Sequence, residues 1–136
     1  MKILIVDDDK CVRDVLTLVL KKENFTVDNS PDGSGALERI KGNGGYRLII
    51  TDVNMPVMDG FAFSLEAKKL LPKTKIMGMS GGSISSVEAN KHFDYFIKKP
   101  FDADQFVNAV NCALNNSKSK NLQRRELSQS RLLAGL

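Results

Sequence analysis

The sequence of 136 residues lacks the features that define several protein classes. It has no tryptophan, and its two cysteines, Cys11 and Cys112, do not have the paired spacing of a zinc site or a CxxC redox motif. No run of about eighteen apolar residues occurs, so no segment is expected to span a membrane. The apolar N-terminal stretch is too short for a signal peptide and runs directly into acidic residues. We therefore expect a cytoplasmic protein.

The single histidine and the two cysteines have no expected chemical role. His92 has no partner at metal-ligand spacing. Cys11 lies near the start of the first expected helix and Cys112 late in the last one. If these helices lie side by side and run the same way, an offset of about eight residues separates the cysteines by roughly 12 Å. A disulfide requires Cα atoms within about 7 Å, so we expect none.

The net charge of +4 is concentrated at the C-terminus. Residues 1–116 contain equal numbers of basic and acidic residues, whereas residues 117–136 contain five basic residues and only Glu126 as an acid. We therefore expect one domain at 1–116, followed by a basic C-terminal tail at 117–136. The tail has two open interpretations: a linker or frayed extension, or an amphipathic helix that docks on a partner, on a second copy or on this domain. A neutral domain and a tail without aromatic residues do not favour nucleic-acid binding.

Short apolar runs alternate with helical patterns along residues 1–116. The runs predict strands at residues 2–6, 25–27, 48–50, 75–79 and 95–97. Helices are expected at 12–20, 32–41, 61–71, 83–91 and 102–114, with Asp9 and Asp102 as N-caps. This order predicts an α/β fold with a doubly wound, five-stranded parallel sheet and helices on both faces. Ligands of such sheets bind beyond the carboxyl ends of the strands.

Carboxylates follow two of these strands at the carboxyl end. Asp7, Asp8 and Asp9 follow the first strand, and the third ends at Asp52. If the two strands are neighbours, the carboxylates repel one another unless a cation compensates their charge. Hard oxygen ligands favour Mg²⁺, and the main-chain carbonyl of Asn54 could complete its coordination.

A hydroxyl and an amine follow the other strands. Ser80 lies at the end of the fourth strand, and Lys99 precedes Pro100 after the fifth. A lysine can pair with a phosphate as a point charge, and a hydroxyl can donate a hydrogen bond to a phosphoryl oxygen. Acids, hydroxyl and amine at one edge indicate phosphoryl transfer, in which catalysis is mostly positioning and charge neutralisation.

Four motifs resemble a known family. ILIVDDD, LIITDVNMPVMDG, MGMSG and IKKPF are similar to the response regulator receiver domain, as in the CheY-like proteins of two-component signalling. The resemblance covers residues 1–116 and implies a flavodoxin-like sheet with strand order 2-1-3-4-5. It also implies a switch protein that modifies itself and is not an enzyme with a separate substrate.

The resemblance implies a role for each matching residue. Asp52 would accept a phosphoryl group from a sensor histidine kinase or a histidine phosphotransfer protein. Mg²⁺ would be held by Asp7, Asp8, Asp52 and the Asn54 carbonyl. Lys99 and Ser80 would contact the phosphoryl group, and Ser80 and Phe96 would act as the switch pair that changes the face presented to a downstream target protein. The Lys99–Pro100 bond would be cis.

Two departures from the family pattern affect the expected output face. Only eighteen residues separate Ser80 from Lys99, so the fourth helix should be short. Phe96 stands where the family commonly has tyrosine, so this side chain has no hydroxyl to donate. A homodimer through the fourth helix, fifth strand and fifth helix, as receivers form, is correspondingly less favoured.

Two alternatives stay open at the level of sequence. A Mg²⁺-dependent phosphohydrolase of the haloacid-dehalogenase type also phosphorylates an aspartate, within a D-x-D pattern that Asp7 and Asp9 satisfy. Against it, Lys10 and Cys11 fit that pattern poorly, and no cap domain is available. The chain could also be the receiver part of a longer regulator.

Overall fold

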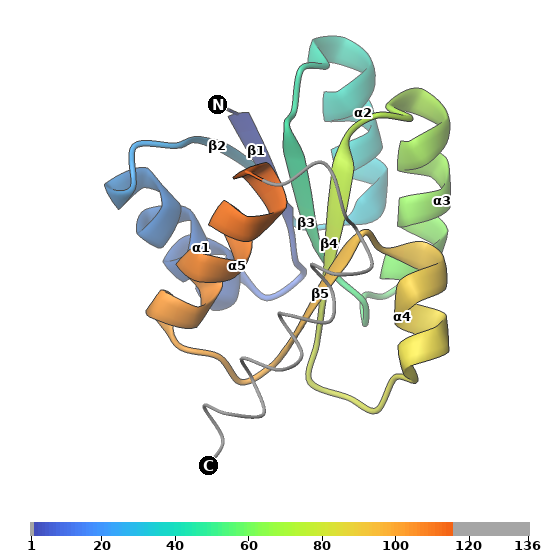
Figure 1. The fold of residues 1–136 in the computed structure, drawn as a ribbon. Coiled ribbons are helices and arrows are strands. Elements are labelled where there is room, and N and C mark those ends of the chain that lie inside the picture. Colours follow the sequence, from blue (N-terminus) through green and yellow to red (C-terminus); the bar gives the residue numbers. More distant parts are fainter. Residues whose placement is uncertain (1, 116–136) are drawn as a thin grey trace.

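The computed structural model describes residues 2–115, which form one parallel sheet and five helices (Figure 1). The strand order is β2-β1-β3-β4-β5, as expected, and every neighbouring pair is parallel. The predicted tail at 117–136 lies outside the described residues. The strands are β1 (Lys2–Val6), β2 (Thr26–Ser30), β3 (Leu48–Asp52), β4 (Lys75–Ser80) and β5 (Tyr95–Lys98), and the helices are α1 (Lys10–Lys22), α2 (Gly33–Asn43), α3 (Gly60–Leu70), α4 (Ser86–His92) and α5 (Ala103–Asn115).

Helices cover both faces of the sheet. Figure 1 shows α1 and α5 on one face and α2, α3 and α4 on the other. Alternate strand residues enter two separate apolar cores: Ile3 and Ile5 pack on the α1/α5 face, whereas Leu4 and Val6 pack on the opposite face. All four side chains are fully buried. The continuous apolar strands are therefore the consequence of burial on both faces, which confirms the predicted doubly wound fold.

The second strand extends further than its apolar run. The sequence predicted a strand at 25–27, but β2 continues to Ser30, because each of its five residues pairs with a residue of β1, from Lys2 opposite Thr26 to Val6 opposite Ser30. Asp28 and Asn29 remain partly exposed on this edge strand, and its polar residues give no apolar signal.

The fourth helix is the shortest, with seven residues, as the spacing between Ser80 and Lys99 predicted. The predicted start at residue 83 was wrong, because Ser85 is the N-cap and has extended backbone angles. Its hydroxyl accepts a hydrogen bond from the main-chain N–H of Glu88 at 3.1 Å, which starts the helix at Ser86. Residues 83–85 consequently belong to the loop that leaves β4.

Two further expectations from the sequence concern a disulfide bond and a membrane-spanning segment. Cys11 is exposed on α1 and Cys112 is partly buried on α5, and within the described residues no disulfide joins them. Of the helices between residues 2 and 115, none combines the length and the apolar character needed to cross a bilayer.

Candidate functional site

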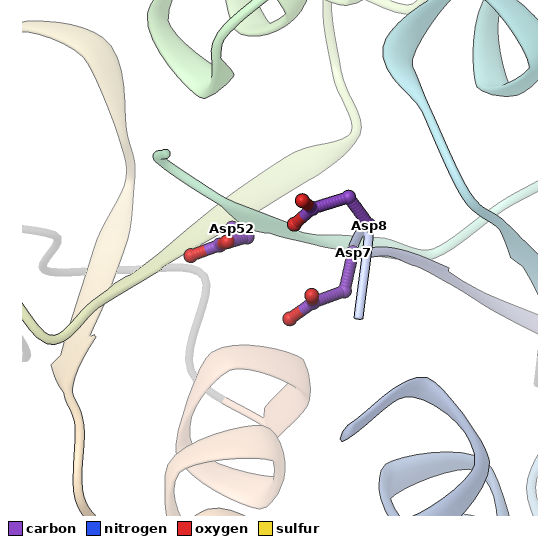
Figure 2. Close-up of side chains that lie close together, drawn as sticks. All are labelled: Asp7, Asp8 and Asp52. Carbon is purple, nitrogen blue, oxygen red and sulfur yellow. The ribbon is translucent and has the colours of Figure 1, made fainter. Parts of the chain in front are cut away.

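Three carboxylates converge where β1 and β3 end. The two strands are neighbours, with Val6 opposite Thr51, so Asp7 and Asp8 follow β1 beside the last residue of β3, Asp52. One carboxylate oxygen from each of the three aspartates lies within 4.8 Å of the others (Figure 2). The sequence predicted this convergence on the condition that the first and third strands are neighbours, and the structure brings the three residues together. We call Asp7, Asp8 and Asp52 the acidic cluster.

The members of the acidic cluster differ in their contact with solvent. Asp7 is completely buried and Asp52 is 7% exposed, whereas Asp8 is exposed. Burial raises the pKa of Asp52, and the nearby charge of Asp7 raises it further, while the ammonium group of Lys99 opposes this rise. Three close carboxylates, two of them buried, could hold a metal ion, which would remove their repulsion.

Gly60 brings the start of α3 against the end of β3. A Cβ atom at this position would lie 2.5 Å from the main-chain oxygen of Asp52 and 2.8 Å from the Cα of Val53. The N–H of Gly60 instead donates to the carbonyl of Val53 at 2.8 Å. Only glycine allows this close approach, so Gly60 fixes the backbone that carries Asp52.

Lys99 supplies positive charge to the acidic cluster. Its Nζ atom lies 3.3 Å from Oδ2 of Asp7 and 3.5 Å from Oδ1 of Asp52. Its main-chain N–H donates to the carbonyl of Ser80 at 2.8 Å, which ties the end of β5 to the end of β4. The bond between Lys99 and Pro100 is cis, as predicted.

Ser80 and Asn54 contact each other beside the acidic cluster. The Ser80 hydroxyl is almost fully buried and accepts hydrogen bonds from Nδ2 of Asn54 at 3.3 Å and from the N–H of Gly82 at 3.1 Å. Both residues also line a cavity of about 280 Å³ between the loop after β3 and α4. The sequence predicted a role for each residue but not the hydrogen bond between them.

Phe96 and His92 lie on the face of the sheet that α3 and α4 cover. Phe96 is partly buried, and its ring centroid is 6.2 Å from that of Phe93. His92 packs against Phe61 at 4.8 Å between ring centroids, and its Nε2 atom is 3.7 Å from a carboxylate oxygen of Glu88. His92 therefore lies in a packed interface between helices and outside the acidic cluster.

Asp9 does not belong to the acidic cluster, although it directly follows Asp8. Its carboxylate accepts hydrogen bonds from the N–H groups of Cys11 at 2.9 Å and Val12 at 3.3 Å, so Asp9 is the N-cap of α1, as predicted. No motif or spacing indicated a role for Arg13, whose guanidinium group donates to the main-chain carbonyl of Asp7 at 2.8 Å.

Comparison with known proteins identifies the family. The family model for the response regulator receiver domain matches residues 3–111. The chain is 33% identical over 120 residues to the chemotaxis protein CheY of Bacillus subtilis, covering 84% of this chain and 98% of that protein. It is 37% identical over 119 residues to the transcriptional regulator NtrC of Azospirillum brasilense, covering 85% of this chain but only 24% of the longer protein.

The fold is also similar to solved structures of this family. The chemotaxis protein CheY4 of Vibrio cholerae superposes with a TM-score of 0.78 at 26% identity, covering 83% of this chain and 98% of that structure. Relatives of the matched region include sensor kinases as well as regulators, among them the sensor kinase LuxN of Vibrio harveyi, of which the chain spans 14%. With its sheet order, its acidic strand ends and these matches, the chain belongs to the response regulator receiver domain family, whose members are signalling switches.

Proposed function

We propose that this protein is a phosphoacceptor switch of a two-component system that takes a phosphoryl group onto Asp52. The observation that carries the proposal is the position of Asp52, which ends β3 within the acidic cluster and has Lys99 at 3.5 Å. A carboxylate oxygen of Asp52 forms the new bond to phosphorus, while the phosphorus–nitrogen bond to the donor histidine breaks and the histidine leaves with the electron pair. Lys99 neutralises part of the charge on the phosphoryl oxygens.

The donor atoms of the acidic cluster fit Mg²⁺. They are carboxylate oxygens, which this ion prefers, and the main-chain carbonyl of Asn54, in the loop after β3, is the proposed further oxygen ligand. Asp7, Asp8, Asp52 and Asn54 would hold the ion. The bound ion would screen the carboxylates from the incoming phosphoryl group. Asp7 is fully buried, so it contributes a charge that water alone cannot compensate.

Ser80 and Phe96 are the proposed switch residues. The Ser80 hydroxyl now accepts hydrogen bonds from Asn54 and Gly82. Both bonds use the Ser80 oxygen as an acceptor, so its O–H is available to donate to a phosphoryl oxygen on Asp52. A movement of Ser80 towards that oxygen would carry the loop from Gly82 to α4 with it. Phosphorylation would therefore shift the population between two arrangements of this loop, α4 and Phe96, which changes the face offered to a target protein.

The partners belong to the same proposal. A sensor histidine kinase or a histidine phosphotransfer protein would supply the phosphoryl group, and a downstream protein would recognise the altered face, in a cytoplasmic setting. Since regulators such as NtrC extend far beyond the matched region, the output of the whole protein is not fixed by residues 2–115.

The structure counts against the haloacid-dehalogenase alternative. That reaction requires the second acid of the D-x-D pattern, here Asp9, to face the phosphoryl site. Instead, the Asp9 carboxylate caps α1. The main-chain N–H of Asp9 donates to Oδ1 of Asp7 at 2.9 Å.

Intact-mass spectrometry after incubation with acetyl phosphate tests the proposal. We expect the wild type to gain one phosphoryl group only when Mg²⁺ is present, Asp52→Asn to gain none, and Asp28→Asn to behave as the wild type, because Asp28 lies away from the acidic cluster. A modification that persists in Asp52→Asn would show that another residue is the nucleophile. If the wild type gains nothing from acetyl phosphate or from a histidine phosphotransfer donor, the proposal is wrong.

A further inference from the structure

Arg13 on α1 contacts the loop that carries the acidic cluster. One of its terminal nitrogens donates to the main-chain carbonyl of Asp7 at 2.8 Å, a distance typical of a charge-assisted hydrogen bond. This carbonyl belongs to the peptide that joins Asp7 to Asp8, so the contact acts on the main chain between two members of the acidic cluster.

The position of Arg13 is unfavourable for α1 itself. The helix begins at Lys10, so Arg13 lies at the end of its first turn, where the helix dipole repels positive charge, and this turn contains no acidic residue. The Nε atom of Arg13 is also buried without a hydrogen-bond partner among residues 2–115. A cation at a helix N-terminus with a buried, unpaired donor weakens the helix, so its stabilising contact must lie outside α1.

The loop from Asp7 to Asp9 is held by a series of hydrogen bonds. The N–H of Asp9 donates to Oδ1 of Asp7, and the N–H of Arg13 donates to the carbonyl of Asp9 at 3.0 Å. Because the Asp9 carboxylate caps α1, the loop is attached to the helix at Asp9 but not at the preceding peptide. The guanidinium group of Arg13 supplies that second attachment.

We infer that Arg13 is a positioning residue for the metal site: it fixes the peptide between Asp7 and Asp8 so that both carboxylates face Asp52 before a cation binds. The inference rests on the proposed function, since it concerns the same site. The positive charge of Arg13 has the opposite effect on a cation, which it repels. The two effects differ in sign, so binding measurements can separate them.

The test is the affinity for Mn²⁺, followed by electron paramagnetic resonance of the unbound ion, with Mg²⁺ as competitor. Arg13→Met removes the charge and the hydrogen bond, while Arg13→Lys keeps the charge and one potential donor. If Arg13 positions the ligands, Arg13→Met weakens Mn²⁺ binding roughly tenfold, as loss of an outer-shell partner does, and Arg13→Lys restores part of the affinity.

Lys10→Met is the matched control. Lys10 carries the same charge on the same turn of α1, but it is exposed and pairs with Asp14 at 2.6 Å. We expect this variant to bind Mn²⁺ as tightly as the wild type or slightly more tightly. Urea unfolding establishes that each variant is folded at the assay temperature, and Arg13→Lys carries the test if Arg13→Met is not folded.

Two outcomes overturn the inference. Unchanged or tighter Mn²⁺ binding by a folded Arg13→Met variant would show that Arg13 acts through its charge or only on stability. If Arg13→Met does not fold, unchanged or tighter Mn²⁺ binding by Arg13→Lys would overturn the inference in the same way. If the wild type itself does not bind Mn²⁺ or Mg²⁺, the metal site of the proposed function fails as well, and this outcome is recognised without any variant.

Discussion

The two ends of the sheet use aspartate in opposite ways. At the amino-terminal end, each buried or half-buried carboxylate has partners from other elements. Asp94, just before β5, accepts from Nζ of Lys68 at 2.7 Å and from the N–H of Ile76 at 3.0 Å. Asp28 on β2 accepts from the Tyr46 hydroxyl at 2.6 Å and lies 3.4 Å from Nζ of Lys2.

At the carboxyl-terminal end of the sheet, the nearest charged neighbours of the carboxylates are mainly other carboxylates. Asp7, Asp8 and Asp52 lie within 4.8 Å of one another, and Lys99 is shared between two of them at 3.3 and 3.5 Å. The pKa of Asp28 is lowered, chiefly by the Tyr46 hydrogen bond, whereas the pKa of Asp52 is raised, chiefly by burial. The arrangement at the amino-terminal end stabilises the fold. The arrangement at the carboxyl-terminal end leaves electrostatic repulsion between carboxylates, which a bound cation would reduce.

The same substitution at the two ends should change stability in opposite directions. Asp94→Asn removes the charge that pairs with Lys68 across α3 and β5, and we expect the free energy of unfolding to fall by about 2 kcal/mol. Asp52→Asn removes a desolvated charge from the acidic cluster, and we expect a rise of about 1 kcal/mol without Mg²⁺.

Urea unfolding at neutral pH in the presence of a chelator measures both effects. Adding Mg²⁺ should stabilise the wild type and leave Asp52→Asn nearly unchanged, because ligand binding stabilises only the state that binds. A loss of stability in Asp52→Asn without Mg²⁺ would contradict the view that this end of the sheet stores unfavourable charge.

Much of this contrast lies in contacts that the sequence does not reveal. Continuous apolar runs were enough to predict four of the strands closely and the alternation that makes the sheet parallel, because buried strands carry their signal locally. The acidic cluster was predictable too, since a parallel sheet brings its carboxyl ends together. The extent of β2 was not predictable from the sequence, because its polar residues pair with β1 through a register that only the folded sheet defines.

Side-chain partners far apart in the chain also escaped prediction. Lys99 lies 92 residues from Asp7, and its place after the fifth strand indicated the edge of the sheet that it occupies but not its contacts with Asp7 and Asp52. Tyr46 and Asp28 are 18 residues apart in segments of no motif, and Arg13 lies on a face of α1 that apolar periodicity does not specify. Such contacts depend on how helices and strands are placed, so spacing along the chain does not identify them.

Tyr46→Phe weakens the paired end of the sheet by a single hydrogen bond. We expect it to lower the free energy of unfolding by about 1.5 kcal/mol at neutral pH, because the hydroxyl donates to a charged acceptor. The pKa of Asp28 is lower in the folded protein than its ordinary value of 3.8, so its contribution is present above that value. As the pH falls through the folded pKa, Asp28 is protonated, and the difference between Tyr46→Phe and wild type should shrink.

The alkaline side gives a second check on the same pair. Burial, together with Asp28, raises the pKa of Tyr46 to about 12. Stability from this tyrosine is therefore fully present below its unfolded pKa of about 10 and is lost as the pH rises towards 12, a dependence that Tyr46→Phe removes. Denaturant unfolding between acidic and alkaline pH, with Asp28→Ala to complete a double-mutant cycle, measures the coupling, because alanine has no side-chain acceptor. A cost that persists in the Asp28→Ala background would exclude this hydrogen bond as its source.

The two ends also differ in how they tolerate left-handed backbone. Near the acidic cluster, Val57 has φ of 69° and is fully exposed in a γ-turn, in which the N–H of Met58 donates to the carbonyl of Pro56 at 2.8 Å. A β-branched residue is strained in this conformation. At the end of α1, Asn24 has a similar φ of 68°, which asparagine adopts readily.

Replacing each of these residues by glycine should show whether the positive φ at that position carries backbone strain. Val57→Gly relieves the clash of the branched side chain at the cost of a more flexible unfolded chain, and we expect a net gain of about 1 kcal/mol in unfolding free energy. Asn24→Gly should change it by only about 0.3 kcal/mol, since asparagine carries little strain there. Urea titration of both variants measures the difference. If Val57→Gly is no more stable than Asn24→Gly, the loop beside the acidic cluster stores no strain, and only charge distinguishes the two ends of the sheet.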